Sequence, residues 1–197
     1  MSSRPFVIHS RSLPEGQSGE LLRFTRESVQ WEWMSLSARR LSPGARYATT
    51  TNGEEAAFVI LGGECRADWG AGEQAIGKRK NVFDGFPHCV YLPHGHRVNF
   101  VAETVSEIAE CRVPSSADLE PRLIRPEDVA SSLRGGGNAS RQIVDVIKPE
   151  FPADRLRAFA GTCAFAQRAG LLAVEASLTS SMTLQSAAVA LASAATV

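Results

Sequence analysis

Three of the four histidines of this chain and one cysteine lie within nine consecutive residues. They are His88, Cys89, His94 and His96, in the segment VFDGFPHCVYLPHGHRVNF (82–100). Zn²⁺ and Fe²⁺ bind such side chains, but a site needs three or more donors that converge at about 2.0–2.3 Å. Alternation along a strand points His88 and Cys89 to opposite faces. His94 and His96 flank Gly95 in a turn, where side chains face solvent, so we expect no metal site here.

Other reactive side chains lack the partners that catalysis requires. The carboxylates and thiols in question belong to Glu54, Glu55, Asp84, Cys89 and Cys111. A general base must lie within reach of the proton it takes, and a nucleophilic thiol needs a neighbour that lowers its pKa. No diagnostic spacing provides either, and the segment RGGGNAS (134–140) has no lysine for a phosphate-binding loop. The sequence therefore identifies no catalytic, cofactor-binding or metal-binding residue, and we expect the thiols to be buried.

The charge balance argues against extended charged partners. The 197 residues include 21 Lys and Arg, 21 Asp and Glu, and 44% hydrophobic residues. Without a basic field, we expect neither nucleic acid nor a membrane as a partner, and a small neutral or anionic substrate is favoured. Residues 176–197 lack charge but are too rich in Ser, Thr and Gln to span a bilayer. The start lacks a signal peptide and the cysteines are scattered, which favours a cytoplasmic location with free thiols.

Short apolar runs with turn residues between them fill residues 20–115 and predict an antiparallel β-sandwich or small barrel. Gly62-Gly63 is typical of a two-residue hairpin loop and predicts a break between two strands. Within 106–113, Ile108, Glu110 and Arg112 share one face of a strand. The strand-forming ranges are 29–41, 55–70, 81–103, which reads as two strands with a turn at Pro93–Gly95, and 106–113.

The chain changes character after residue 114. Residues 114–138 mix Pro, Ser and charge and predict a linker, with a short helical turn near 126–129, before a strand over 141–147. Beyond residue 158 the chain is rich in Ala, Ser and Thr, and only Arg168 and Glu175 are charged. Such composition is typical of disorder or of a shifted reading frame. The predicted units are a β-domain over 1–125, a linker and the start of a second domain over 126–157, and an aberrant tail over 158–197.

An ordered series of motifs resembles the first half of the 5-deoxy-glucuronate isomerase family, which is bicupin and related to 5-keto-4-deoxyuronate isomerase. The series covers about residues 5–157 and reads SPGARY, EAAFVILGGECRADWG, NVFDGFPHCVYLPHG, RPEDV, RGGGNASRQIVDVI and PADRL. The resemblance implies an all-β fold, a cupin-type antiparallel β-barrel or sandwich, as the first half of a bicupin. The irregular segment after residue 157 falls where the second cupin of the family would continue.

The resemblance also implies an activity. The family isomerises an aldose to a ketose, from 5-deoxy-glucuronate to 5-dehydro-2-deoxy-gluconate, in myo-inositol catabolism. A divalent metal in the intact enzyme polarises the carbonyl, and its ligands belong to the second cupin. None can be carried over, because this chain has no histidine after His96 and has Val144 where a family histidine is expected. We therefore expect a chain that is truncated or frameshifted after residue 157, binds no metal and lacks the catalytic cupin.

Two other readings remain open. The chain could be a metal-free single-cupin module that binds a sugar acid, with Arg97, Arg112 and Tyr91 as its contacts, or a structural β-domain that mediates oligomerisation. A small sugar acid is the expected partner both of the isomerase and of the binding module. Because barrel edges commonly pair, a homo-oligomer is also expected.

Overall fold

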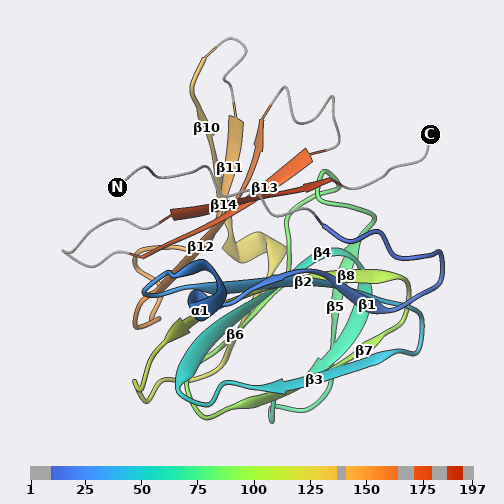
Figure 1. Ribbon diagram of the computed structural model, residues 1–197, viewed down its shortest axis with the longest axis horizontal. Helices are drawn as coiled ribbons and strands as arrows, with labels where there is room; N and C mark the ends of the chain where they lie inside the picture. Colours follow the sequence, from blue (N-terminus) through green and yellow to red (C-terminus); the bar gives the residue numbers. More distant parts are fainter. Residues whose placement is uncertain (1–9, 137–140, 164–170, 179–185, 193–197) are drawn as a thin grey trace.

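The computed structural model describes residues 10–136, 141–163, 171–178 and 186–192, and nearly all of their regular structure is antiparallel β-sheet (Figure 1). The predicted antiparallel β architecture is confirmed. The described helices are α1 (Arg26–Val29) and the 3₁₀ turn η1 (Pro126–Asp128), and neither has the length or apolar character needed to cross a bilayer. The strands are β1 (Gly19–Phe24), β2 (Ser35–Leu41), β3 (Arg46–Thr50), β4 (Glu54–Asp68), β5 (Gln74–Arg79), β6 (Cys89–Leu92), β7 (Arg97–Ala102), β8 (Ser106–Pro114), β9 (Arg122–Ile124), β10 (Ala130–Arg134), β11 (Arg141–Ile147), β12 (Leu156–Cys163), β13 (Leu171–Leu178) and β14 (Ser186–Ala192).

Strand β4 connects the two layers of a β-sandwich. Its first half pairs with β8 and β6 in the main layer, whose strand order is β1-β2-β8-β4-β6-β9. Its second half pairs with β5 and β7, and β7 also pairs with β3, which completes a smaller layer. Strands β6 and β7 confirm the strand–turn–strand segment predicted over 81–103, but they do not pair with each other: β6 pairs with β4 and β9, and β7 pairs with β3 and β4. Strand β8 confirms the strand predicted over 106–113.

The predicted hairpin loop at Gly62-Gly63 is wrong, because β4 runs through both residues for 15 positions. The pairing register shifts between Ile60 and Gly62 on the β8 side and between Gly63 and Glu64 on the β5 side. Gly63 has φ +87°, and a Cβ there would lie 2.2 Å from the carbonyl oxygen of Val105. Glycine is needed here for a β-bulge, which bends the strand from one layer into the other, and not for a turn.

The strand predicted over 29–41 is also shorter than expected, since β2 begins only at Ser35. Val29 is the last residue of the short helix α1, and residues 30–34 connect this helix to β2. The Thr25 hydroxyl accepts a hydrogen bond from the Ser28 N–H at 3.2 Å, and the Ser28 hydroxyl accepts one from the Thr25 N–H at 2.9 Å. This reciprocal cap satisfies backbone groups locally and competes with strand pairing.

The alternation of β4 and β8 supplies two separate cores. Phe58, Ile60 and Ile108 face the space between the two layers, where they join Val90 and Phe100 in the inner core. The opposite face of the main layer presents a second apolar set, the outer core, which includes Val59, Cys89, Ala109, Cys111 and Ile124. Because successive strand residues point to opposite faces, each strand contributes to both cores.

A second sheet, β10-β11-β12-β13-β14, covers the outer core (Figure 1). Its contributions are Val146, Ile147, Leu156 and Ala158, each at most 5% exposed. Strand β11 and the turn η1 confirm the strand predicted over 141–147 and the helical turn predicted near 126–129. The second sheet therefore packs against the sandwich and shares one hydrophobic core with it.

The predicted tail, 158–197, contains the end of β12 and all of β13 and β14. These strands pair antiparallel in an unbroken ladder, from Gln142↔Thr162 on the β11 side to Ser177↔Ser186 at the far edge. The predicted boundary at 125 falls between β9 and η1, whereas the one at 157 falls inside β12. The boundaries and the frameshift origin of the tail stay predictions.

Candidate functional site

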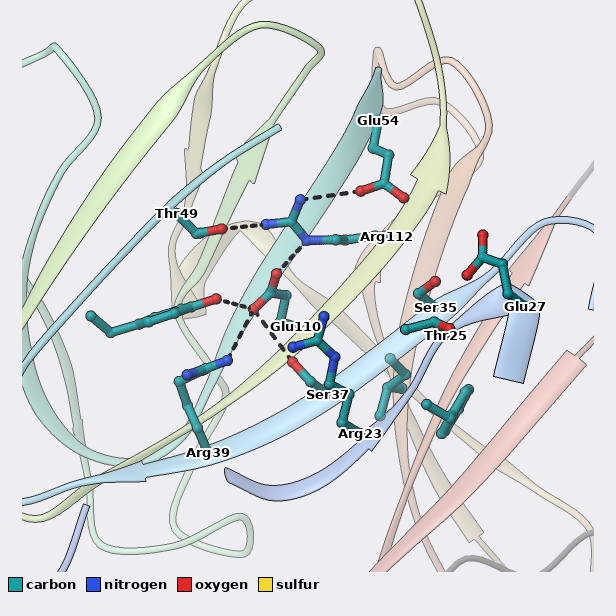
Figure 2. Close-up of a pocket in the computed structure, with 13 residues that line it drawn as sticks. Arg23, Thr25, Glu27, Ser35, Ser37, Arg39, Thr49, Glu54, Glu110 and Arg112 are labelled. Atoms are coloured by element: carbon teal, nitrogen blue, oxygen red, sulfur yellow. Dashed lines mark hydrogen bonds and ion pairs between the residues drawn. The ribbon is translucent and has the colours of Figure 1, made fainter. Parts of the chain in front are cut away.

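A cavity of about 300 Å³ lies at one end of the inner core, where the lining changes from apolar to polar (Figure 2). Its charged lining residues are Arg23, Glu27, Arg39, Glu54, Glu110 and Arg112. Its hydroxyl groups belong to Thr25, Ser35, Ser37, Tyr47 and Thr49. Three arginines and three glutamates around a small volume make this a site for a polar ligand.

Strand register brings these side chains together. Ser37 lies opposite Glu110, and Ser35 opposite Arg112, in the β2–β8 pair. Glu110 and Arg112 continue the face of β8 that begins with Ile108 in the inner core. Tyr47 and Thr49 come from β3 in the smaller layer. The cavity is thus the polar end of the space between the layers, reached by side chains of both.

Glu110 is the centre of the polar network, and its residue is only 5% exposed (Figure 2). Its Oε1 accepts a hydrogen bond from Arg112 Nε, and its Oε2 accepts one from the Tyr47 hydroxyl at 2.6 Å. Oε2 also accepts from Ser37 Oγ at 3.4 Å and lies 3.9 Å from Arg39 Nη2. Three hydrogen bonds reach the carboxylate, one at Oε1 and two at Oε2, and the Arg39 guanidinium adds an ion pair at a longer distance. Glu110 therefore organises the cavity, since its contacts join β8 to β2 and β3.

Arg112 is held as firmly as Glu110. Its Nη1 donates to Glu54 Oε2 at 3.2 Å and to the Thr50 carbonyl at 2.8 Å, and its Nη2 donates to Thr49 Oγ1 at 2.7 Å. Burial alone would lower the pKa of Arg112, but the carboxylates of Glu110 and Glu54 raise it overall. The guanidinium is a fixed positive charge that joins β8 to β3 and β4.

Tyr47 and Arg39 form a stacked pair beside Glu110. The Arg39 guanidinium carbon lies 3.5 Å from the centroid of the Tyr47 ring, a cation–π contact. Burial, together with the negative charge of Glu110, raises the pKa of Tyr47 to about 12. The phenol is therefore neutral near pH 7 and acts as a hydrogen-bond donor.

The structure places the histidines of the 82–100 segment apart from this cavity and gives each its own partner. His88 Nδ1 accepts from the Gly77 N–H at 3.3 Å, and His94 Nδ1 accepts from the Gly53 N–H at 2.8 Å. His96 Nδ1 lies 3.0 Å from the carbonyl oxygen of His94. Within the described ranges, no group of three His, Cys, Asp or Glu side chains could hold a metal ion. The divalent metal implied by the family resemblance therefore does not fit the described residues.

The thiols and remaining carboxylates have structural surroundings. Cys89 and Cys111 are fully buried in the outer core, and burial raises the pKa of both, that of Cys111 to about 12. Asp84 Oδ2 accepts from the Lys80 N–H at 2.9 Å, while Glu55 points away from the cavity that Glu54 lines. Of the segment 134–140, residues 137–140 lie outside the described part of the chain.

Of the three predicted sugar-acid contacts, only Arg112 lines the cavity. Tyr91 has no exposed surface, and its hydroxyl donates to Glu55 Oε2 at 2.6 Å, so that prediction is wrong. Arg97 is exposed on β7, outside the lining. Sequence reasoning missed Glu110, Arg39 and Tyr47. The available signal was two charged residues, at 110 and 112, on the same strand face as a buried isoleucine.

Comparison with known proteins identifies relatives of this chain. A model of the KduI/IolB family matches residues 7–159. A protein of Geobacillus thermodenitrificans named 5-deoxy-glucuronate isomerase is 32% identical over 157 residues, which cover 77% of this chain and 55% of the relative. A protein of the same name from Geobacillus kaustophilus is 32% identical over 156 residues, 76% of this chain and 54% of the relative. The chain thus spans about half the length of the curated relatives it matches.

Solved structures give the same picture. The crystal structure of an IolB-like protein from Salmonella typhimurium LT2 superposes with a TM-score of 0.72 at 25% identity, covering 78% of this chain and 58% of that one. A putative glyoxylate-induced protein from Pseudomonas aeruginosa superposes with a TM-score of 0.56 at 12% identity, covering 77% and 57%, and shares the fold alone.

Proposed function

The chain belongs to the KduI/IolB family, and from this membership we propose that it is part of an aldose–ketose isomerase that converts 5-deoxy-glucuronate into 5-dehydro-2-deoxy-gluconate in myo-inositol catabolism. The observation that carries the proposal is the match to relatives of that name over three quarters of this chain. A small sugar acid is then the partner, and the polar cavity offers arginines and hydroxyls suited to it.

The described residues suit binding better than proton transfer. Isomerisation moves a proton between adjacent carbons through an enediol, which requires a base with a free lone pair and a group that polarises the carbonyl. Glu110 is held in place by three hydrogen bonds and an ion pair, and the described histidines accept hydrogen bonds or lie elsewhere. We therefore assign the described residues to holding and orienting a ligand, and we assign the proton transfer to groups outside them.

One experiment separates the activity of the family from that of this chain. Purified 197-residue chain and a chimera would each be incubated with 5-deoxy-glucuronate, and conversion followed by proton NMR with and without added Mn²⁺ or Zn²⁺. The chimera joins residues 1–157 to the half of the Geobacillus thermodenitrificans relative that this chain does not cover. We expect conversion by the chimera and none by the chain alone.

An unexpected result with the chimera and an unexpected result with the chain alone would contradict different parts of the proposal. A folded chimera that leaves 5-deoxy-glucuronate unchanged would argue against the isomerase assignment. Conversion by the chain alone would support the assignment but overturn the view that proton transfer needs other groups. The unaltered Geobacillus thermodenitrificans relative, which has its own first half, is the matched control for folding and activity.

A metal-free binding module for a sugar acid is the second candidate. The feature that favours it is the ion network of Glu110, Arg112 and Glu54, whose charges pair with one another at the cavity. Binding of 5-deoxy-glucuronate by the chain, combined with an inactive chimera, would favour this reading.

A further inference from the structure

We propose that Arg39 binds the carboxylate of a small, singly charged hydroxy acid in the cavity, and that the Glu110–Arg112 pair is the fixed floor beneath it. The choice of a sugar acid as that ligand rests on the proposed function. The argument for Arg39 rests on how the three arginines of the cavity differ in their partners.

Two of these arginines, Arg112 and Arg23, are less suited to binding a ligand. All the guanidinium nitrogens of Arg112 donate to partners within the protein: Glu110, Glu54, Thr49 and the Thr50 carbonyl. The side chain of Arg23 is 60% exposed at the rim and lies 3.6 Å from Glu20. A solvent-exposed pair of this kind adds little binding energy or orientation.

Arg39 has donors to spare. Its side chain is 18% exposed, and its Nη2 reaches Glu110 only at 3.9 Å. Its Nε is buried and has no hydrogen-bond partner. An arginine presents five N–H donors in a rigid planar fork that matches a carboxylate, and leaving them unpaired costs free energy. A ligand carboxylate in the cavity would supply acceptors to the Nη groups of Arg39, whose ion pair with Glu110 is 3.9 Å long.

The fork is also oriented before any ligand binds. The guanidinium carbon of Arg39 lies over the Tyr47 ring, 3.5 Å from its centroid, and the Tyr47 hydroxyl is fixed by its 2.6 Å hydrogen bond to Glu110. This chain of contacts holds the guanidinium plane next to the cavity (Figure 2). A side chain that is already oriented loses less conformational entropy when it binds.

The rest of the lining indicates the class of ligand. Hydroxyl groups of Ser35, Ser37 and Thr49 can bond to ligand hydroxyls, and a volume of about 300 Å³ lies at the small end of ligand pockets. The three arginines are balanced by three glutamates, so the cavity has no strong positive field. This balance favours a monocarboxylate over a phosphorylated sugar, whose double charge would meet the carboxylates of Glu54 and Glu110.

Isothermal titration calorimetry on the full chain tests the proposal, with glucuronate as the probe and glucose as the matched neutral sugar. We expect glucuronate to bind at least tenfold more tightly than glucose, because charge-assisted hydrogen bonds are the strong ones. Arg39→Gln should weaken glucuronate binding at least tenfold and leave glucose binding within twofold. Arg39→Lys, which keeps the charge but loses the fork, should fall in between.

The control variant is Arg46→Gln, which removes an exposed arginine from β3 next to Tyr47 and outside the cavity lining. It should bind glucuronate within twofold of the unaltered chain. Melting temperatures of all variants establish that they fold, and Arg39→Lys decides the outcome if Arg39→Gln does not fold. Equal binding of glucose and glucuronate, or unchanged glucuronate affinity in the folded Arg39 variant, would overturn the inference. An active chimera combined with that result would leave the isomerase proposal intact and remove only the role of Arg39.

Discussion

At the scale of single residues, the polar cavity is stable because its charges neutralise one another. A buried ion costs several kcal/mol in lost hydration unless partners replace the water. Glu110 has Arg112 and Arg39 as cations and Tyr47 and Ser37 as donors, and Arg112 has Glu54 as its second anion. The same contacts hold Glu110 in one position at the cavity. Arg39 alone of the buried members keeps an unpaired donor.

His88 shows how an imidazole can be structural in a chain that has few of them. It is half-buried, its Nδ1 accepts from the Gly77 N–H, and its carbonyl accepts from the Ile60 N–H at 3.0 Å. Burial lowers the pKa of His88, and Glu127 nearby opposes this shift only in part. The ring is therefore a neutral acceptor that ties β5 to the start of β6.

This arrangement predicts a pH dependence of stability. The folded state takes up a proton at His88 less readily than the unfolded state, whose histidine pKa is about 6.5. The stabilisation from neutral His88 is therefore present above about pH 6.5 and lost as the pH falls through the lowered pKa of the folded state. Because the ring is partly exposed, we expect a loss below about 1 kcal/mol between pH 7.5 and 5.5.

Urea denaturation of the unaltered chain and of His88→Gln at several pH values measures this contribution. Glutamine keeps an acceptor for the Gly77 N–H but does not titrate, so the variant should lose less stability than the unaltered chain as the pH falls. Identical slopes for the two proteins would rule out His88 as a source of the pH dependence.

At the scale of elements, β4 sends two adjacent carboxylates to different sites. Glu54 lines the cavity, and Glu55, with no exposed surface, faces the second sheet. Glu55 Oε1 accepts from the Arg155 and Leu156 N–H groups, each at 2.6 Å, and Oε2 accepts from the Asp154 N–H at 3.0 Å and from Tyr91. One carboxylate thus satisfies three successive backbone donors where β12 begins, about 100 residues away in sequence.

Glu55→Gln should therefore destabilise the chain by about 3 kcal/mol, since the amide nitrogen replaces an acceptor with a donor and leaves buried N–H groups unpaired. Urea denaturation gives the free energy of unfolding, and hydrogen exchange should be faster at residues 154–156 than elsewhere in the main layer. Glu64→Gln, an exposed position on the same strand, is the control and should change stability by less than about 0.5 kcal/mol. Equal stability of the two variants would contradict the role of Glu55.

At the scale of the whole molecule, the sandwich and the second sheet share the outer core. Val146, Ile147 and Leu156 from the second sheet pack with Leu36, Val59 and Cys111 of the main layer. Tyr91 and Phe151 add an edge-to-face contact with ring centroids 5.2 Å apart. Since the main layer would otherwise expose its apolar face, the two sheets should unfold together.

Leu156→Ala tests this cooperativity. Leu156 is 1% exposed, and its truncation should cost about 3 kcal/mol through lost burial and the cavity it leaves. Tryptophan fluorescence reports on the main part of the chain, because Trp31, Trp33 and Trp69 all precede the second sheet, and hydrogen exchange of β11 reports on that sheet. Both transitions should shift to lower urea together. Loss of β11 protection with an unshifted fluorescence transition would mean that the two sheets unfold independently.

How far the sequence predicts this protein depends on the range of each interaction. Alternation and turn residues predicted the antiparallel β class and strands β6, β7, β8 and β11, because a strand's two faces are set by neighbouring residues. The same local patterns failed at Gly62-Gly63, where a positive φ suits a bulge as well as a turn. Which of the two forms depends on the partner strand and not on the glycines.

The sequence by itself determined the fold class, the buried thiols and the family resemblance, since these depend on composition, period and motif order. Only the tertiary structure decided where the polar cavity lies and that Tyr91 serves Glu55 and not a ligand. It also decided that Arg39 keeps an unpaired donor, while every guanidinium nitrogen of Arg112 donates within the protein. The physical reason is that strand register, set by long-range pairing, determines which side chains converge from β2, β3, β4 and β8, and no local period encodes that convergence.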